Sequence, residues 1–485
     1  MDIKITNLNE VYLQIECSDS VSYELRDAFT FFVPGYQYTP QFRAKLWNGK
    51  IYLYDVRKRL IYRGLIQQII SFAQDRNYTI SYDDFDNEFS INEANEFIRS
   101  LNLKIEPRDY QVDAFVHAIR HKRALLLSPT ASGKSFIIYL ILRYIQDKLS
   151  RKKTLIIVPT TSLVSQLTTD FADYGYDSDN CVHKIYSGQD KDTEKPVVIS
   201  TWQSLFKQPK KYFDQYDSVF IDECHLAKAK SLTDIMVNLT KADYRIGTTG
   251  TLDGTKTHRL VIEGLTGPVK KVTTTKELMD QKHIADFEIK CLVLKHSDSI
   301  CQAAKNFTYQ QEIEYLVLNE SRNNFIANLG VSLNGNTLIL YQYVDKHGKI
   351  LFDMINSKAS DDRKVFFVYG KTDVDIREDI RSIVETETNA IIIASYGVFS
   401  TGINIRNLHN IIFASPSKSR VRNLQSIGRG LRKSDTKSSA VLYDIADDMK
   451  YKKKTNYTLN HFTERIRIYS EERFKFKIYK ITLKE

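Results

Sequence analysis

The sequence predicts an α/β protein: two tandem lobes, each built on a parallel sheet, with a small N-terminal α+β domain and a short helical, basic C-terminal tail. From about residue 101, near-continuous apolar runs alternate with amphipathic helical stretches, and the same alternation restarts at residue 337. Such runs are typical of parallel strands that helices cover on both faces. A chain of 485 residues is also too long for one ordinary core and suits about three domains.

The first 95 residues predict the small α+β domain, because they lack the strand–helix alternation. Short alternating stretches at 11–15 and 50–54 are typical of half-buried strands, and residues 65–75 have helical spacing. The polar, acidic tract at 83–96 indicates a surface linker.

The two lobes are expected at residues 100–285 and 286–449, joined near residues 286–330. Predicted strands of the first lobe are 124–127, 154–158, 197–200, 218–221 and 244–247. Those of the second lobe are 337–341, 364–369, 390–395, 410–414 and 440–444. The tail, residues 450–485, is predicted to be helical and carries eleven Lys and Arg against four Glu.

The charge and the cysteines restrict the class of protein. A net charge of +10 and an isoelectric point near 9.0 favour a polyanionic partner. No apolar run approaches the ~20 residues that cross a bilayer, and no signal-peptide pattern follows the first residues. The five cysteines are scattered and none has zinc-site spacing, so we expect reduced thiols, no structural metal and a cytoplasmic location.

The first motif is Ser-Pro-Thr-Ala-Ser-Gly-Lys-Ser at 128–135, between a predicted strand and a predicted helix. In that context backbone N–H groups and the helix N-terminus converge on one anion. Gly133 permits close approach of the backbone, Lys134 neutralises phosphate oxygens, and the Ser135 hydroxyl can bind Mg²⁺. Ser128 stands where the usual pattern has glycine, and the alternative is a chance helix cap.

The second motif, Asp-Glu-Cys-His at 222–225, follows another predicted strand. Side chains at the carboxyl ends of parallel strands lie where α/β folds bind ligands. Asp222 is expected to hold Mg²⁺, and Glu223 to orient or deprotonate the attacking water. His225 is a candidate for coupling the site to nucleic acid, although a lone histidine is more often structural.

The third motif is Gln-Ser-Ile-Gly-Arg-Gly-Leu-Arg at 425–432. Arg429 and Arg432 are three residues apart, so on a helix they share one face, as two guanidiniums that bind phosphate oxygens would. Because they belong to the second predicted lobe, we expect them and Gln425 to complete the nucleotide site only when a cleft between the lobes closes. The alternative is a solvated basic helix.

These motifs, with six further blocks in order, resemble the superfamily-two helicases of the DExH type over residues 105–445. The further blocks are residues 108–111, 158–163, 199–204, 247–252, 338–341 and 394–403. The resemblance implies two RecA-like lobes and ATP with Mg²⁺ as cofactors. It implies a nucleotide site formed by Gln111, Thr130, Ala131, Ser132, Gly133, Lys134, Ser135, Gly402, Arg429 and Arg432, with Gln111 reading adenine.

The same resemblance implies residues that contact nucleic acid, namely Thr160, Thr201, Trp202, Tyr341 and Tyr396. It also implies that Thr249 to Thr251 couple hydrolysis to strand movement, although this chain has Gly-Thr-Thr-Gly-Thr where the family has Ser-Ala-Thr.

Within the superfamily the chain looks most like the UvsW-type recombination and repair helicases of phage, through residues 47–53, 159–161, 170–174, 201–203 and 394–402. That likeness implies branch migration and unwinding of branched DNA, namely forks, Holliday junctions and R-loops, whose RNA is a further ligand. We expect a monomer, with single-strand-binding or recombination proteins as candidate partners and no membrane. A phage-encoded protein of this type would act in the host cytoplasm.

Residues 37–63 interleave aromatic residues with cations and are the candidate DNA contact of the N-terminal domain. For Arg43, Lys45 and Lys50 we favour contact with phosphates. For the aromatics we favour the core of the small domain over stacking on bases, because such a domain needs large side chains to fill its interior.

Three alternatives stay open at this point. The first is a double-stranded DNA translocase or an RNA helicase, and the second is the motor subunit of a restriction-type nuclease. The third is a binding module with an inactive nucleotide site, which Lys134, Glu223 and Arg432 argue against. ATP hydrolysis measured with and without DNA of each kind separates these classes.

Overall fold

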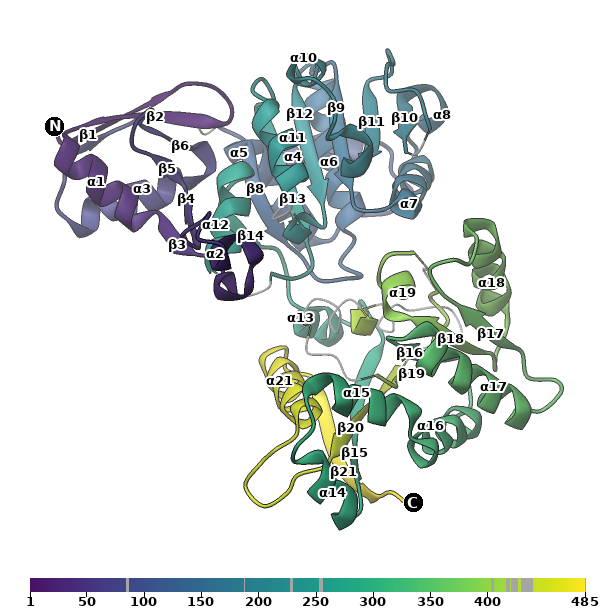
Figure 1. The fold of residues 1–485 in the computed structure, drawn as a ribbon. Helices are drawn as coiled ribbons and strands as arrows, with labels where there is room; N and C mark the ends of the chain where they lie inside the picture. Colours follow the sequence, from purple (N-terminus) through teal and green to yellow (C-terminus); the bar gives the residue numbers. More distant parts are fainter. Residues whose placement is uncertain are drawn as a thin grey trace. The chain divides into compact units, whose positions relative to one another are not determined.

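The structure of the chain is a computed structural model. The structure describes residues 1–83, 87–186, 188–226, 230–252, 256–402, 405–415, 419, 426–428 and 439–484. Two compact units divide it: residues 1–128 with 133–273, and residues 129–132 with 274–485. Figure 1 shows the N-terminal domain and the first lobe in purple to teal, and the second lobe in teal (α13 and β15), green and yellow.

The N-terminal domain is a mixed sheet with helices, as predicted. Its sheet has the order β5-β6-β2-β1-β7, and a separate ribbon pairs β3 with β4. The strands are β1 Ile3–Asn7, β2 Tyr12–Cys17, β3 Thr30–Phe32, β4 Lys50–Tyr52, β5 Tyr54–Asp55, β6 Leu60–Tyr62 and β7 Ile80–Ser81. The helices are α1 Asp19–Ala28, α2 Pro40–Arg43 and α3 Ile66–Asp75, with short 3₁₀ turns at η1 Tyr36–Tyr38 and η2 Arg63–Leu65.

The first lobe is a parallel sheet of seven described strands in the order β10-β11-β9-β12-β13-β8-β14. These are β8 Arg123–Leu127, β9 Thr154–Val158, β10 Val182–Ile185, β11 Val197–Thr201, β12 Ser218–Asp222, β13 Tyr244–Thr249 and β14 Val269–Lys271. Its helices are α4 Ile91–Ser100, α5 Asp109–His121, α6 Lys134–Asp147, α7 Thr161–Asp173, α8 Ser178–Cys181, α9 Trp202–Leu205, α10 Lys210–Phe213, η3 Cys224–Leu226, α11 Lys230–Asn238 and α12 Lys256–Leu265.

The acidic tract expected as a linker is helical in part. Helix α4 begins at Ile91, after a capping box in which Ser90 and Glu93 satisfy each other's backbone N–H groups. Its Ala94 and Phe97 are buried in the core of the first lobe. The prediction of a surface linker at 83–96 was therefore wrong for the residues of α4.

The second lobe repeats the parallel design, with the described strands in the order β17-β18-β16-β19-β20-β15-β21. They are β15 Asp286–Lys295, β16 Thr337–Tyr341, β17 Val365–Val368, β18 Ile391–Ser395, β19 Asn410–Phe413, β20 Ser439–Asp448 and β21 Lys475–Thr482. Its helices are α13 Thr275–Asp280, α14 Asp298–Ala304, α15 Tyr309–Leu318, α16 Glu320–Ser332, η4 Val344–Gly348, α17 Lys349–Lys358, α18 Val374–Thr386, α19 Tyr396–Gly402 and α21 Tyr457–Glu471.

Two features of the second lobe differ from the prediction. Strand β15 lies inside the region expected to join the lobes, and it pairs along its whole length with β20. The tail was expected to be helical throughout, but only α21 is; β21 then pairs with β15 as an edge strand. The tail is therefore part of the second lobe's sheet and not an appendage.

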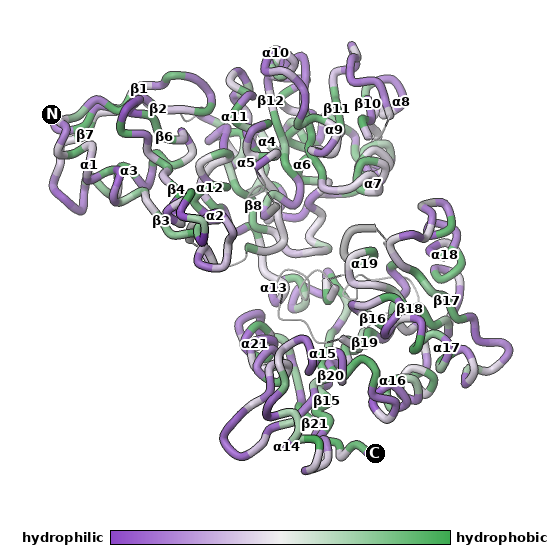
Figure 2. The backbone as a smooth tube through the Cα atoms, viewed as in Figure 1, coloured by the Kyte–Doolittle hydropathy of each residue, from purple (hydrophilic) through white to green (hydrophobic). Residues whose placement is uncertain are grey.

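Burial on both faces explains why the central strands read as continuous apolar runs. Along β9, Ile156 and Val158 enter one hydrophobic core, whereas Leu155 and Ile157 enter the other. In Figure 2 the hydrophobic colour follows β12, and the hydrophilic colour marks the surface helix α10. Among the described helices, none is both long and apolar enough to cross a membrane.

The N-terminal domain is joined firmly to the first lobe. The Glu10 carboxylate accepts from the buried guanidiniums of Arg63, at 2.5 Å, and Arg123, at 2.8 Å. Leu260 of α12 packs in the core of the N-terminal domain. A Cβ on Gly64 would lie 2.0 Å from the Glu263 carbonyl oxygen, so the two backbones touch there. The domain and this lobe therefore form one unit.

Candidate nucleotide site

The phosphate loop leaves the end of β8 and enters α6 at Lys134. The Ser128 backbone N–H donates to the Thr249 carbonyl at 2.9 Å, which ties the loop to the end of β13. Ala131 and Gly133 both have left-handed backbones, with φ of 69° and 79°. Together with Thr130 and Ser132 they form the turn that leads to the N-terminus of α6, the position at which helices bind anions.

Gly133 lies against α5. A Cβ there would lie 2.4 Å from Nε2 of the buried Gln111. The Gln111 Oε1 accepts from the Arg108 backbone N–H at 2.9 Å, so the amide is fixed at the start of α5. The structure thus places Gln111 beside the phosphate loop, and only glycine fits the backbone between them.

Lys134 and the second motif lie at the same edge of the sheet. The Lys134 ammonium donates to the Ser128 carbonyl at 3.4 Å and lies 3.9 Å from Glu223 Oε1. Strands β8 and β12 both flank β13, so their carboxyl ends converge. The cation needed for a triphosphate and the carboxylate needed for a water nucleophile are therefore neighbours.

Asp222 ends β12 and is held from the next strand. The Thr248 hydroxyl donates to Asp222 Oδ1 at 2.8 Å, and the Glu223 backbone N–H donates to the same oxygen at 3.0 Å. Burial raises the pKa of the Asp222 carboxyl, and the Glu223 charge raises it further. A cation beside Asp222 would pair with the charge of the ionised carboxylate and so offset the cost of burying it.

His225 and Glu223 both lie close to the Thr249 hydroxyl. His225 Nδ1 lies 3.0 Å from the Thr249 Oγ1 and 3.2 Å from Glu223 Oε2. The Thr249 hydroxyl also lies 3.4 Å from Glu223 Oε2 and 3.0 Å from the Thr251 carbonyl oxygen. Glu223 itself has a left-handed backbone, with φ of 52°. The second motif and the Gly-Thr-Thr-Gly-Thr block are therefore in direct contact.

Sequence reasoning missed two partners of the site. It did not identify Thr248 as the residue that holds Asp222, although parallel register makes the two direct neighbours. It also did not find that the Ser135 hydroxyl lies 3.0 Å from the Tyr174 hydroxyl after α7. Neither contact has a spacing signature along the chain.

The residues present suit a nucleotide and Mg²⁺. At Gly133 the loop backbone carries no side chain, and a Cβ there would clash with its neighbours. This bare backbone lies next to the N-terminus of the 14-residue helix α6. Ser135 and Asp222 offer the hard oxygen donors that Mg²⁺ prefers, and Mg²⁺ commonly takes only one or two carboxylates with water and phosphate.

Three residues predicted to complete the site, Gln425, Arg429 and Arg432, fall outside the described residues, and their roles stay predictions. Gly402 ends α19 of the second unit.

The predicted nucleic-acid contacts divide into two groups. Thr160 precedes α7 and its hydroxyl lies 3.0 Å from that of Ser162, whereas Thr201 is buried before the half-buried Trp202. Tyr341 and Tyr396 are also buried, and their hydroxyls donate to the carbonyls of Val368 and Ser415. Because their rings are core residues, the structure corrects the prediction that Tyr341 and Tyr396 touch nucleic acid.

In the N-terminal domain, Arg43 and Lys45 are exposed and Lys50 is half-exposed. The expectation that the aromatics at 37–63 are core is right for Tyr54, which is buried. It is wrong for Tyr38 and Tyr52, which are exposed.

Three protein-family models match the chain. They are the DNA helicase UvsW N-terminal family at residues 2–83, the type III restriction enzyme res subunit family at 104–254, and the helicase conserved C-terminal domain at 321–434. The ATP-dependent DNA helicase uvsW of Enterobacteria phage T4 is 36% identical over 508 aligned positions that span 100% of both chains. The DNA 3'-5' translocase XPB2 of Sulfurisphaera tokodaii is 26% identical and covers 70% of this chain and 82% of its own.

Solved structures agree with these likenesses. The crystal structure of T4 UvsW is 34% identical, covers 100% of both chains and has a TM-score of 0.53. Mss116p bound to single-stranded RNA and AMP-PNP shares the fold alone, at 14% identity and a TM-score of 0.55 over 82% of this chain and 81% of that one.

Proposed function

The chain belongs to the UvsW family of ATP-dependent DNA helicases, and we propose that it unwinds and branch-migrates branched DNA such as forks, Holliday junctions and R-loops. The observation that carries the proposal is the convergence of Lys134, Asp222 and Glu223 at one edge of a parallel sheet. A site of this composition hydrolyses a nucleoside triphosphate.

Within this proposal each residue has a task. Lys134 and the N-terminus of α6 neutralise the triphosphate, and Gln111, beside the phosphate loop, recognises the base. Ser135 and Asp222 would hold Mg²⁺, which supplies positive charge to the transferring phosphoryl group. Glu223 orients the attacking water and receives its proton.

Thr249 gives hydrolysis a route to the nucleic acid. Its hydroxyl contacts both His225 and Glu223, so a change at the γ-phosphate alters the hydrogen bonds of the loop after β13. We propose that Arg429 and Arg432 complete the site from the second lobe when the lobes close, with Gln425 beside them. DNA is the proposed ligand of the protein, which acts as a monomer in the host cytoplasm.

The test is a panel of nucleic acids. ATP hydrolysis and strand displacement are measured on forks, Holliday junctions, R-loops and blunt duplex. Branched substrates are expected to stimulate hydrolysis most and to be resolved. Stimulation by blunt duplex alone, without strand displacement, would assign the chain to the translocases instead.

Lys134→Ala is expected to lower turnover to below a hundredth of the wild-type rate, because it removes the cation next to the phosphates, while DNA binding persists. Lys148→Gln is the matched control, since Lys148 is exposed at the far end of the same helix. A Lys134→Ala protein that hydrolyses ATP at the wild-type rate would refute the site.

A further inference from the structure

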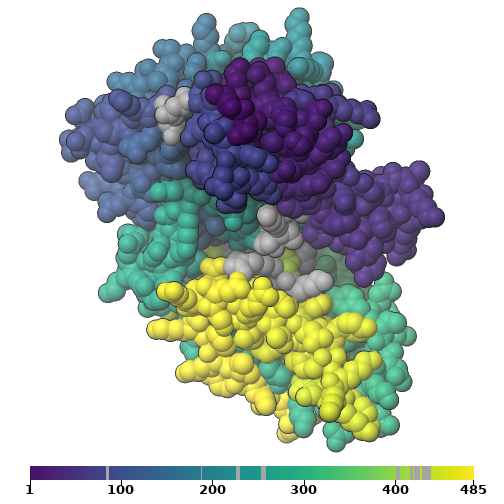
Figure 3. Space-filling view, turned by 90° about the vertical axis from the view of Figure 1, so that its left-hand side faces the viewer, coloured from purple at the N-terminus to yellow at the C-terminus, as the bar shows by residue number. Residues whose placement is uncertain are grey.

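The segment between β3 and β4 has no core of its own, yet it is rich in large apolar side chains. Of residues 33–49, all of them described, Gly49 alone is buried. Tyr38 is 71% exposed and Leu46 81%, and Tyr52 at the end of β4 is 50% exposed. We call residues 33–52 the β3–β4 insertion. Figure 3 shows a part of the purple N-terminal domain that stands out from the rest of that domain.

The exposed side chains stand on a fixed frame. Gly49 has a left-handed backbone, with φ of 80°, and the Tyr36 ring fills the space where a Cβ would lie. The Tyr36 ring meets Phe42 edge-on, with ring centroids 4.7 Å apart. The Trp47 indole N–H donates to the Lys50 carbonyl at 2.9 Å. These contacts brace the insertion from within and leave its outer surface exposed.

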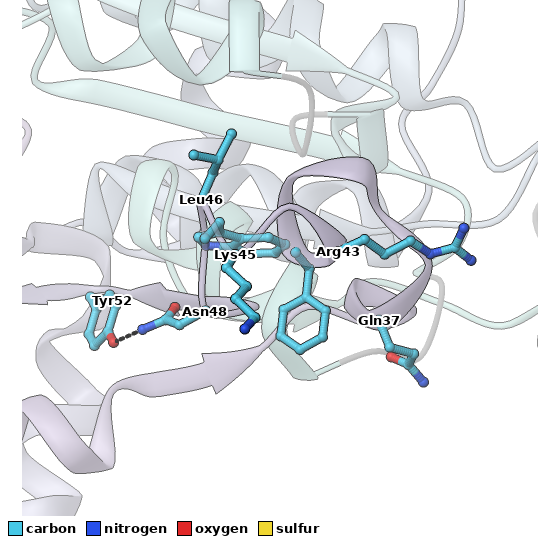
Figure 4. Close-up of a pocket in the computed structure, with 8 residues that line it drawn as sticks. Gln37, Arg43, Lys45, Leu46, Asn48 and Tyr52 are labelled. Atoms are coloured by element: carbon cyan, nitrogen blue, oxygen red, sulfur yellow. Dashed lines mark hydrogen bonds between the residues drawn. The ribbon is translucent and has the colours of Figure 1, made fainter.

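The insertion lies at the surface, where its residues line an open pocket of about 810 Å³. It is lined by Gln37, Phe42, Arg43, Lys45, Leu46, Trp47, Asn48 and Tyr52. Figure 4 shows the labelled side chains around it, with Asn48 donating to the Tyr52 hydroxyl at 2.7 Å. Two cations, three aromatic rings and two amides thus share one hollow, and it contains no acidic side chain.

This combination of groups matches unpaired nucleotides. Aromatic rings stack on bases whatever their sequence, and cations beside them track the phosphates. An exposed apolar patch of this kind on a protein surface marks a binding site more often than chance. A duplex would hide its bases from these rings, and an acidic peptide would pair with the cations but leave the rings without partners.

The domain that carries the insertion is linked to the first lobe. The N-terminal domain and the first lobe share the Glu10–Arg63–Arg123 cluster and the backbone contact at Gly64. Movement of that lobe during ATP hydrolysis therefore carries the insertion with it.

We propose that the β3–β4 insertion binds the unpaired bases of one DNA strand, with Tyr52 and Trp47 stacking on bases and Arg43 and Lys45 pairing with phosphates. This inference rests on the proposed function, because it supplies the place where a separated strand is kept from re-pairing. The insertion acts as a strand-holding surface that the first lobe moves along the DNA.

The test measures binding of the full chain, without nucleotide, to a 12-residue oligo(dT) and to a 12-base-pair duplex. Tyr52→Ser is expected to weaken oligo(dT) binding about 5- to 150-fold, which corresponds to the ~1–3 kcal/mol of one stacked base. Duplex affinity is expected to change less than twofold. Tyr52→Phe is the matched control: it keeps the ring and loses only the bond from Asn48, so oligo(dT) binding stays within twofold.

Two further measurements separate stacking from charge. Oligo(dT) should quench the emission of Trp47, one of only two tryptophans, and the quenching should disappear in Trp47→Phe. Neutralising Arg43 and Lys45 to Gln should lower the slope of log affinity against log salt by about 0.7 for each lost phosphate contact. Lys148→Gln should leave that slope unchanged.

Leu46→Asp is a second variant whose substitution lies outside the β-strands. Because Leu46 is 81% exposed, the change is not expected to affect folding. It should weaken oligo(dT) binding at an unchanged melting temperature. Wild-type oligo(dT) affinity in both Tyr52→Ser and Leu46→Asp, or an equal loss on duplex, would overturn the inference. So would capture of a protein ligand by the insertion in place of DNA. Because the binding needs no ATP, failure of the helicase proposal would appear separately, as absent hydrolysis with oligo(dT) binding intact.

Discussion

Gly133 shows how one residue determines the shape of the nucleotide site. It needs a left-handed backbone, which glycine adopts freely, and it leaves no room for a side chain beside Gln111. The two requirements have different consequences: the backbone conformation affects stability, and the steric one affects the position of Gln111.

Gly133→Ala is expected to raise the KM for ATP more than tenfold, because the new methyl group displaces the Gln111 amide from the loop. It should also cost about 1–2 kcal/mol of stability through the strained backbone. Gly188→Ala is the matched control. Gly188 has a similar φ of 83°, and no heavy atom of the described structure lies within 4 Å of the added Cβ.

The Gly188→Ala protein should lose stability and keep the wild-type KM. Steady-state kinetics and thermal unfolding of both variants measure the two effects. Equal KM values for both would show that Gln111 plays no part in holding the nucleotide.

Other residues show how far the candidate site could be predicted. Lys134 could be predicted from the strand–loop–helix pattern, and Asp222 and Glu223 from their place at the end of a predicted strand. The structure brings the three residues together. Thr248 could not be predicted, because its contact with Asp222 depends on the register of two strands 26 residues apart. The prediction that Tyr341 and Tyr396 contact nucleic acid was wrong, because a motif match gives the position of a residue in the chain and not the direction of its side chain.

At the scale of elements, helix α21 shows how the tail is held in place. The Arg465 guanidinium donates to the Asp444 carboxylate on β20 at 2.8 Å, and both side chains are buried. The Tyr469 hydroxyl donates to the same carboxylate at 2.9 Å. The same helix carries an exposed pair, Arg467 and Glu471, at 3.0 Å.

Arg465→Met is expected to destabilise the protein by about 3–5 kcal/mol, because it leaves the Asp444 charge buried without its partner. The double variant Arg465→Met, Asp444→Leu should recover much of the loss. Arg467→Met should change stability by less than about 1 kcal/mol, since its pair is exposed to solvent. Urea denaturation of the four proteins tests this, and a loss in Arg467→Met as large as that in Arg465→Met would contradict it.

Elements also show which strands can be predicted. Central strands such as β9 and β12 are buried on both faces, so their sequences are continuous apolar runs from which the strands could be predicted. The edge strands β10, β14 and β21 contain lysines, because an edge strand faces water and charge protects it from pairing with other chains. Their sequences therefore resemble loops or helices. Strand β15 was missed although it is central, because its polar first half lies where a linker was expected.

At the scale of the molecule, the Glu10 cluster decides whether the N-terminal domain moves with the motor. Deleting residues 1–95 is a poor test of DNA binding, because it would remove α4 in part and leave Arg123 without its carboxylate. A single substitution that loosens the contact is cleaner.

Glu10→Gln is expected to free the N-terminal domain from the first lobe, because it leaves the guanidiniums of Arg63 and Arg123 buried without a counter-charge. Removing one partner of such a cluster costs about 3–5 kcal/mol. Burial raises the pKa of Glu10, but Arg123 and Arg63 outweigh it and hold the pKa below its usual value. The contact is therefore fully stabilising above pH ~4.5 and weakens as the pH falls through the lowered pKa.

Limited proteolysis with trypsin reports the loosening, because a freed domain exposes the chain at Arg63, which is buried in the wild type. The wild type should resist cleavage there at pH 7 and pH 5, whereas Glu10→Gln should be cut at both. Lys4→Gln, which breaks an exposed pair with Glu16 in the same domain, should behave as the wild type. If the domain carries the β3–β4 insertion with the motor lobe, Glu10→Gln should keep oligo(dT) binding and lose strand displacement. Loss of both together would instead mean that the substitution unfolds the domain.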